Sequence, residues 1–229
     1  VGRWLHELVP RRRGPQRLPL AWLHLSVPAA DEAHRPRARA PVRPQVSISC
    51  AWLRPMTDEL VLYVDANYLS PWALTAFVAL EEKRLPYRLE TRVLSRKETF
   101  APGYFARTQR VPALQRGGFW LAESTAIAEY LAERFPYPKH PRLFPEDLEQ
   151  RGTCRELQMW LRTDLAALRQ ARPTTTLWFA RARDPLPPDA AEAADRLVRV
   201  LEPLLSHGRP TLFESWCIAD VDVALMLQR

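Results

Sequence analysis

The chain has 229 residues, of which 47% are hydrophobic and 26% charged, a composition typical of globular proteins. No stretch approaches the roughly 18 apolar residues that a membrane-spanning helix requires. Its three cysteines, Cys50, Cys154 and Cys217, are far apart and form no Cys-x-x-Cys pair, so the sequence indicates neither a disulfide framework nor a zinc site. This cysteine usage fits a reducing compartment, and we expect a cytoplasmic protein without a metal.

The formal net charge of +7 comes entirely from the first quarter of the chain. Residues 1–55 contain ten arginines, no lysine and three acidic residues, whereas residues 56–229 contain 23 basic and 23 acidic residues. The first segment also holds eight of the 22 prolines and shows no lasting hydrophobic period. Such a composition cannot bury enough apolar surface to offset the entropy of ordering, so we expect disorder there. Because the body is neutral, we do not expect a nucleic-acid partner.

The first methionine is Met56, four residues before a strand-like run. We therefore interpret residues 1–55 as upstream of the natural start, and Arg229 as a truncation inside a helical pattern. A signal peptide is the alternative, because RRRGPQR, LPLAWLHLSV and PAADEA resemble its basic, apolar and small-residue parts. His24 interrupts the apolar part, however, and a further Arg/Pro-rich stretch follows.

From Met56 onward, strand and helix periods alternate in a regular order. The expected elements are strands at 60–64 and 87–94 around a helix at 70–83, an irregular stretch to Thr108, strands at 111–115 and 119–122, and a helix at 124–135. The first three make a βαβ unit, which implies parallel strands and a right-handed crossover. The turn Gly117-Gly118 predicts an antiparallel hairpin from the last two strands.

A proline-rich linker separates this α/β region from an all-helical one. We predict an α/β domain at 56–136, a linker at 137–146 and an incomplete helical domain at 147–229. The expected elements of the helical domain are a long helix at 147–170, a second at 187–206, a connector at 211–213 and a last helix from 218 to the end of the chain.

Ser70-Pro71 stands at the start of the first helix. Serine is a preferred N-cap and proline is favoured at the next position, so capping alone accounts for the pair. A helix N-terminus also presents unpaired N–H groups that stabilise an anion, and a hydroxyl there is able to donate to a bound thiolate. Ser70 is thus a candidate cap, a candidate catalytic group, or both.

Two later turns carry similar polar groups. In Val111-Pro112, a cis peptide bond would explain a proline in a strand-like run and would leave the main chain of Val111 free to pair with an extended ligand; a trans proline on an edge strand is the alternative. In Glu123-Ser124, both residues could serve only to cap the helix. They could also hold a zwitterion, with Ser124 and helix N–H groups on its carboxylate and Glu123 on its ammonium group.

Taken in order, these features resemble the cytosolic glutathione S-transferases, which combine a thioredoxin-like domain with an all-α domain. More narrowly, DANYLSPWAL, RVPALQ, ESTAIAEYLAERFP, WLRTDL, RPT and LFESWCIADVDVALM resemble the bacterial YfcF-type glutathione transferases. The resemblance runs from about Leu60 to Arg229. It implies that Ser70 faces the glutathione sulfur, that Val111 pairs its main chain with the cysteinyl part ahead of a cis Pro112, and that Glu123 and Ser124 hold the γ-glutamyl end.

Two further groups of residues are candidates. Asn67 and Tyr68 lie in the same turn as Ser70 and could donate to glutathione as well. The resemblance makes Trp160, Arg162 and Thr163 candidates for the second-substrate site. Trp160 in the core and Arg162 in a salt bridge is the alternative for those residues. Asp220 matches a buried helix-capping position of the family, although Cys217 stands where the usual serine or threonine cap would be, which puts the reciprocal capping box in doubt.

Two comparisons narrow the chemistry of the first turn. Glutaredoxins have Cys-Pro-aromatic-Cys there, whereas this chain has Ser70-Pro71-Trp72-Ala73, so no dithiol cycle is available and redox chemistry would need the thiol of glutathione. Many animal transferases use a tyrosine within the first strand, where Tyr63 stands. We favour Ser70, because it lies at the helix start and Tyr63 could belong to the core.

We therefore expect a homodimeric glutathione transferase that activates the glutathione thiolate toward small hydrophobic electrophiles, with a possible peroxidase activity on hydroperoxides. The alternative is a non-catalytic protein-interaction module with the same fold, because fold alone does not establish chemistry. Glutathione is the expected cosubstrate in the first case.

Overall fold

The computed structural model describes residues 58–179 and 182–229. The expectations for residues 1–55 and for Met56 lie outside the described residues. None of the helices in the described part of the chain has the length and apolar character needed to cross a membrane.

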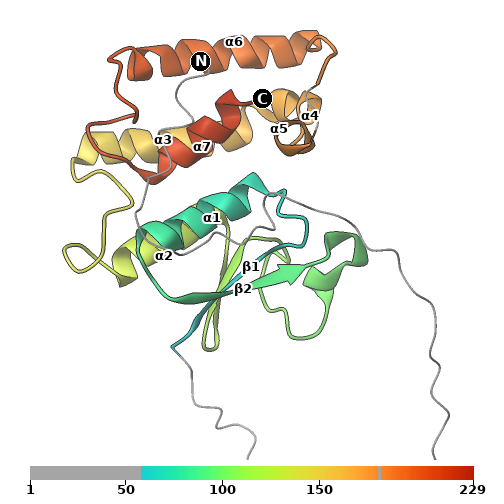
Figure 1. Ribbon diagram of the computed structural model, residues 1–229, viewed down its shortest axis with the longest axis vertical. Helices are drawn as coiled ribbons and strands as arrows, with labels where there is room; N and C mark the ends of the chain where they lie inside the picture. Colours follow the sequence, from blue (N-terminus) through green and yellow to red (C-terminus); the bar gives the residue numbers. More distant parts are fainter. Residues whose placement is uncertain (1–57, 180–181) are drawn as a thin grey trace, which may run out of the picture. The chain divides into compact units, whose positions relative to one another are not determined.

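The first half forms a mixed four-stranded sheet with two long helices (Figure 1). The elements are β1 (Leu60–Asp65), α1 (Pro71–Glu82), β2 (Tyr87–Arg92), β3 (Ala113–Arg116), β4 (Phe119–Ala122) and α2 (Ser124–Arg134). The strand order is β2-β1-β3-β4, with β1 parallel to β2 and antiparallel to β3, and β3 antiparallel to β4. This confirms the predicted βαβ unit and hairpin, and with them the thioredoxin-like arrangement.

The two faces of β1 are both buried, which explains its continuous apolar sequence LVLYV. Leu60, Leu62 and Val64 join the core under α1 and α2. Val61 and Tyr63 point to the other face and pack with Tyr104 and other residues of the irregular segment before β3. That segment contains two short 3₁₀ turns, η2 (Leu94–Arg96) and η3 (Glu98–Phe100), where the sequence indicated no lasting period.

The second half contains helices and no strand in the described residues. Its elements are α3 (Leu148–Thr163), α4 (Ala166–Ala171), α5 (Thr175–Trp178), α6 (Pro188–Leu205) and α7 (Ile218–Leu227). Helices α6 and α7 match the sequence prediction closely. The short helix α5 was not predicted.

The single helix predicted at 147–170 is wrong, because the chain breaks between α3 and α4 at Asp164-Leu165. Thr163 and Asp164 both have low helix propensity. Arg169 then donates to the main-chain oxygens of Leu161 at 2.6 Å and Arg162 at 2.7 Å, which satisfies carbonyls that the ending helix leaves without partners.

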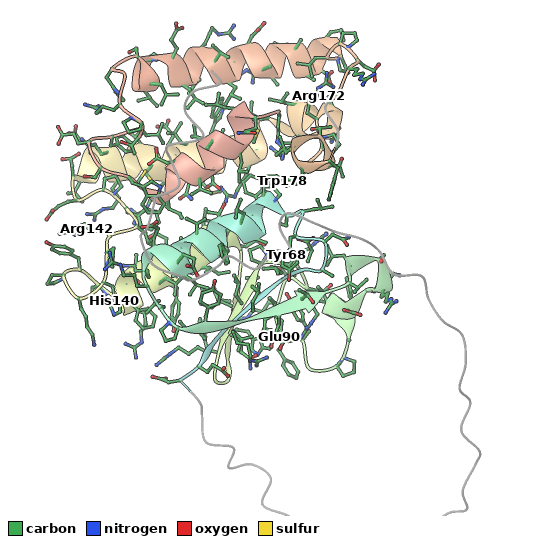
Figure 2. The ribbon with its side chains drawn as sticks, viewed as in Figure 1. Tyr68, Glu90, His140, Arg142, Arg172 and Trp178 are labelled. Carbon is green, nitrogen blue, oxygen red and sulfur yellow. The ribbon has the colours of Figure 1, made fainter. Side chains whose placement is uncertain are left out.

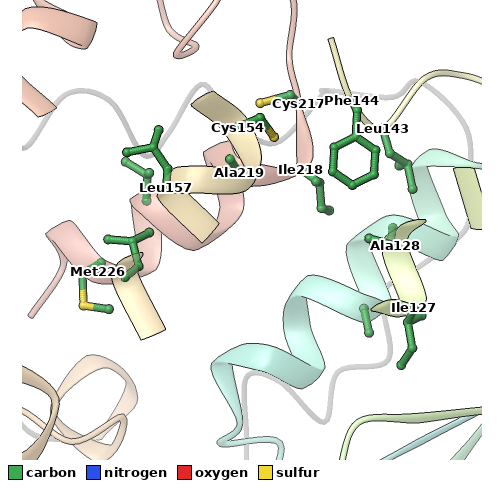
Figure 3. Close-up of a cluster of buried hydrophobic side chains, with 14 of the residues drawn as sticks. Ile127, Ala128, Leu143, Phe144, Cys154, Leu157, Cys217, Ile218, Ala219 and Met226 are labelled. Atoms are coloured by element: carbon green, nitrogen blue, oxygen red, sulfur yellow. The ribbon is translucent and has the colours of Figure 1, made fainter. Parts of the chain in front are cut away.

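One apolar core runs through both halves. Figure 3 shows its helical side, where Leu157 of α3 lies along α7, which carries Ala219 and Met226, and where Phe144 and Leu143 lie beside Ile218. Burial of these side chains is the main term that holds the helical half against α1 and α2.

Residues 137–146 make up most of the loop that joins α2 to α3, and it contains no helix or strand. Two of its residues, His140 and Arg142, are labelled in Figure 2. The His140 ring nitrogen Nδ1 lies 3.1 Å from the main-chain oxygen of Lys83, and the Lys83 ammonium group donates to the main-chain oxygen of Phe135 at 2.7 Å. The loop is therefore tied to the last turns of α1 and α2.

Candidate functional site

The start of α1 is organised by two side chains. Ser70 is the N-cap, and its Oγ accepts a hydrogen bond from the main-chain N–H of Ala73 at 3.2 Å. Asp65, the last residue of β1, is 5% exposed and accepts from the main-chain N–H groups of Leu69 at 2.8 Å and Ser70 at 2.9 Å. The turn from β1 to α1 is thus fixed by a contact from Ser70 back to Asp65 and by a contact from Ser70 forward to Ala73.

The other residues of this turn are more open. Asn67 is exposed, and Tyr68 has a positive φ of 56° and packs against the core. Tyr68 lies next to the start of α1 in Figure 2. Asn67 and Ser70 therefore lie in one turn, as the sequence indicates.

Tyr63 belongs to the core on the opposite face of β1 and is only 6% exposed. Its hydroxyl donates to Oε1 of Gln115 at 2.7 Å, its ring stacks on Trp120 at 4.8 Å between centroids, and the Arg92 guanidinium lies over the ring at 4.5 Å. Burial raises the pKa of the Tyr63 hydroxyl. These contacts give Tyr63 a packing role in the core, which is the alternative that the sequence left open for it.

The peptide bond between Val111 and Pro112 is cis. Pro112 is buried and β3 begins at the next residue, Ala113. Val111 therefore lies just outside the paired region of the sheet.

Glu123 and Ser124 occupy the turn from β4 into α2. Glu123 has φ 72° and ψ 119°, an uncommon conformation for a residue other than glycine, and it is exposed. A residue held in such a region costs about 1–3 kcal/mol and persists only where its surroundings determine it. Ser124, the first residue of α2, is 2% exposed.

Strand register brings these three turns to one end of the sheet. Tyr63 pairs with Ala113, and Ala113 pairs with Ala122. The end of β1, the start of β3 and the end of β4 are therefore neighbours. The turns that hold Ser70 and Glu123 follow the ends of β1 and β4, and the turn that holds Val111 leads into the start of β3. Residues spread over some fifty positions of sequence thus face one region.

The helical half contributes Arg162 to this region. Its Nη2 donates to Oγ of Ser124 at 2.8 Å, its Nη1 lies 3.3 Å from Oδ2 of Asp222, and its guanidinium lies 4.1 Å from the centre of the Trp72 ring. The salt bridge is the alternative that the sequence left open for Arg162.

The other two residues expected at a second-substrate site lie on the same helix. Trp160 is partly buried against the core, and its Nε1 donates to Oδ2 of Asp164 at 3.1 Å. The Thr163 hydroxyl is exposed and lies within hydrogen-bond distance of the main-chain oxygens of Met159 and Trp160. Both side chains are therefore engaged with their own helix.

Asp220 lies in the first turn of α7. Its carboxylate accepts from the main-chain N–H groups of Leu212 and Cys217, each at 2.7 Å, and both halves of the capping box with Cys217 are present. Burial raises the pKa of Asp220. The hydrogen bond with Cys154, followed by burial, raises the pKa of the Cys217 thiol, and the two cysteines are neighbours in Figure 3.

Sequence reasoning missed Asp65, Thr75 and Asp222. An aspartate that ends an apolar strand five residues before Ser-Pro is a usable signal for Asp65, because aspartate side chains often accept from nearby main-chain N–H groups. Thr75 and Asp222 carry no such signal, since each looks like an ordinary helical residue. Across residues 58–179 and 182–229, no three His, Cys, Asp or Glu side chains are grouped in a way that could hold a metal ion.

The mixed sheet, with the helical half packed on α1 and α2, defines the glutathione-transferase fold. Family models match both halves: a glutathione S-transferase N-terminal domain at residues 69–134 and a C-terminal domain at 147–229. A solved glutathione transferase homologue from Burkholderia, with bound glutathione, is 36% identical, with a TM-score of 0.61 over 75% of this chain and 82% of that one. The chain belongs to the glutathione S-transferase superfamily.

Curated relatives include theta-class enzymes. Glutathione S-transferase theta-1 of mouse is 35% identical over 109 residues, which is 46% of this chain and 43% of the mouse protein, and the rat protein is 33% identical over the same shares. The chain thus aligns with less than half of each. A delta-class transferase of Nilaparvata lugens, 22% identical with a TM-score of 0.58 over 73% of this chain and 76% of that one, shares the fold.

Proposed function

We propose that this protein is a glutathione transferase that binds glutathione at the shared end of β1, β3 and β4 and activates its thiol. The observation that carries this proposal is the convergence of the turns of Ser70, Val111 and Ser124 at that end of the sheet. Family membership supports it, and so does the bound glutathione of the Burkholderia homologue.

Ser70 is the proposed catalytic residue. Its oxygen already accepts from the N–H of Ala73, so its own hydroxyl hydrogen remains available to donate to a sulfur anion. The N-terminus of α1 adds a positive dipole end. Together they would lower the pKa of the glutathione thiol from about 8.5, so that more thiolate is present at neutral pH.

The rest of glutathione would lie along the same end of the sheet. Val111 would pair its main chain with the cysteinyl part, next to the cis Pro112. Ser124 and the first N–H groups of α2 would hold the γ-glutamyl carboxylate, and Glu123 its ammonium group. Asn67 is a further donor within the Ser70 turn.

In the reaction, the glutathione thiol loses its proton to solvent. The thiolate forms a carbon–sulfur bond with the electrophile, and the leaving group departs with the electron pair of the broken bond. The second substrate would lie near Trp160, Arg162 and Thr163. We also propose membership of the YfcF-type group, a homodimer and a cytoplasmic location. A peroxidase activity is proposed as well: the thiolate attacks the terminal oxygen of a hydroperoxide, the O–O bond breaks and the alcohol leaves. A second glutathione thiol then converts the resulting sulfenic acid to glutathione disulfide and water.

The test uses the complete chain on immobilised glutathione, with elution by free glutathione. Turnover is then measured with chlorodinitrobenzene and with cumene hydroperoxide. We expect retention and transfer to chlorodinitrobenzene. Retention without turnover on either substrate would favour the non-catalytic binding module, and the absence of both would contradict glutathione as the ligand.

A further inference from the structure

A cluster of polar side chains, buried except for the partly exposed Arg162, lies where the two halves of the protein meet. It joins four helices through side-chain hydrogen bonds, and its members are Thr75 of α1, Ser124 of α2, Gln158 and Arg162 of α3, and Asp222 of α7. Polar groups buried in a core are kept only when they are hydrogen-bonded. The cluster therefore has a defined arrangement rather than a loose one.

Asp222 is the centre of the cluster, and its side chain is 0% exposed. Its Oδ1 accepts from the Thr75 hydroxyl at 2.6 Å, and its Oδ2 accepts from Nε2 of Gln158 at 2.8 Å and from Nη1 of Arg162 at 3.3 Å. A buried carboxylate with three donors has its hydrogen-bonding capacity well satisfied. The Asp222 carboxylate thereby fixes Nη1 of the Arg162 guanidinium.

The rest of Arg162 is fixed by its other neighbours. The Trp72 ring lies 4.1 Å from the guanidinium carbon, and the main-chain oxygen of Gln158 accepts a further hydrogen bond from Nη1. Because the guanidinium is planar and rigid, fixing its plane and Nη1 also fixes the direction of Nη2. Nη2 is the atom that donates to Ser124, at 2.8 Å.

This contact determines how the Ser124 hydroxyl is used. Arginine has donors and no acceptor, so the serine oxygen must be the acceptor in this hydrogen bond. The hydroxyl hydrogen of Ser124 is therefore left to donate elsewhere. We propose that Arg162, held by Asp222, is a positioning residue that makes Ser124 a donor to the γ-glutamyl carboxylate of glutathione.

This inference rests on the proposed function and gives Arg162 a different role from the second-substrate contact. Without Arg162, the Ser124 hydroxyl would be free to rotate and to donate inward, and Asp222 would lose its cationic partner. A hydrogen bond to a charged group contributes enough that its loss weakens binding about 10-fold or more. Only ligands that carry the γ-glutamyl carboxylate should lose this affinity.

The experiment compares two unreactive ligands by calorimetry: S-methylglutathione and the same compound with a 4-aminobutyryl group in place of γ-glutamyl, which lacks only the α-carboxylate. Wild-type protein should prefer S-methylglutathione by about 10-fold or more. Arg162→Met and Ser124→Ala should each remove most of this preference. The double variant should show the same ligand preference as Ser124→Ala alone, because Arg162 acts through Ser124.

Arg155→Met is the matched control. Arg155 lies on the same helix, about two turns before Arg162, and forms an ion pair with Glu129 of α2 at 2.6 Å. Its loss therefore removes an α2–α3 arginine contact that does not involve Ser124. The Arg155→Met variant should prefer S-methylglutathione over the ligand without the carboxylate by the same factor as the wild type does. If Arg162→Met does not fold, as judged by thermal unfolding, Asp222→Asn takes its place and should show the same loss of preference.

Two results would overturn the inference. If Arg162→Met weakens both ligands equally, so that the preference is unchanged, Arg162 only supports the fold. If the double variant loses the preference by the product of the two single-variant factors, Arg162 contacts the ligand independently of Ser124. Failure of the wild-type protein to bind either ligand would instead contradict the proposed function itself.

Discussion

The carboxylate of Asp65 accepts the main-chain N–H of Ser70 at 2.9 Å, so the last residue of β1 sets the position at which α1 begins. The same carboxylate accepts the N–H of Leu69 through its other oxygen. The Ser70 hydroxyl is thus placed by a buried side chain. We regard Asp65 as the structural support of the proposed catalytic serine.

Asp65→Ala should therefore lower both stability and activity. It would leave two partly buried main-chain N–H groups without an acceptor, a loss of about 2–4 kcal/mol in the free energy of unfolding. Urea denaturation measures this loss, and kcat/KM with chlorodinitrobenzene measures the effect on Ser70. Asp65→Asn retains one acceptor oxygen and should lie between the two. Equal stability of all three proteins would show that the contact does not support the turn.

Ser70→Ala should affect the thiol more than the binding of glutathione. The loss of the cap should lower the free energy of unfolding by about 1 kcal/mol. The pKa of bound glutathione, followed by the ultraviolet absorbance of the thiolate, should rise toward the free value of about 8.5. Ser70→Asp is the matched variant, because aspartate caps a helix well and has no hydroxyl to donate. If the pKa and the turnover of Ser70→Ala equal those of the wild type, Ser70 is only a cap.

Thr75→Val should destabilise the contact between α1 and α7. The two side chains have similar shape, but valine gives no hydrogen bond to Asp222, which the threonine hydroxyl reaches at 2.6 Å. We expect a loss of about 1–3 kcal/mol in the free energy of unfolding, measured by urea denaturation. Thr163→Val, on an exposed helix surface, should change it by less than about 0.5 kcal/mol. Similar values for the two variants would argue against the interdomain role of Thr75.

The stability of the protein should depend on Lys83 in alkaline solution. Burial lowers the pKa of this ammonium group below its ordinary value of 10.5. Between the folded pKa and 10.5 the unfolded chain binds more protons at Lys83 than the folded chain does, so the free energy of unfolding rises with pH in that window. The stabilisation gained there is lost again as the pH falls through the folded pKa. The difference in unfolding free energy between wild type and Lys83→Met should therefore shift in favour of the wild type as pH rises. A difference that is constant with pH would contradict the shift.

Asp220→Ala should remove the cap of α7. Two main-chain N–H groups, those of Leu212 and Cys217, would lose their acceptor, at a cost of about 2–5 kcal/mol in the free energy of unfolding. Thermal unfolding measures the loss. Asp195→Ala on the exposed surface of α6 is the control and should shift stability by less than about 0.5 kcal/mol. A small effect of Asp220→Ala would show that the capping box contributes little to the helical half.

Much of the fold was predictable because its signals are local. The apolar run of β1, the Ser70-Pro71 start of α1 and the Gly117-Gly118 turn each indicate one element and its limits. The break at Asp164 was not predictable in the same way. The apolar period continues across it, and the carbonyls of the last turn of α3 are satisfied by Arg169, five residues beyond the break.

In the candidate site, too, some features follow from local sequence and others depend on tertiary contacts. The sequence by itself determined which short turns carry a hydroxyl, a cis-compatible proline or a carboxylate at a helix start, because capping and backbone preferences act between neighbouring residues. Only the tertiary structure decided that Arg162 reaches Ser124, that Asp222 holds Arg162, and that Tyr63 packs on the far face of β1. Those contacts join residues 38 and 60 positions apart, and their formation depends on how the helices pack rather than on any pattern along the chain.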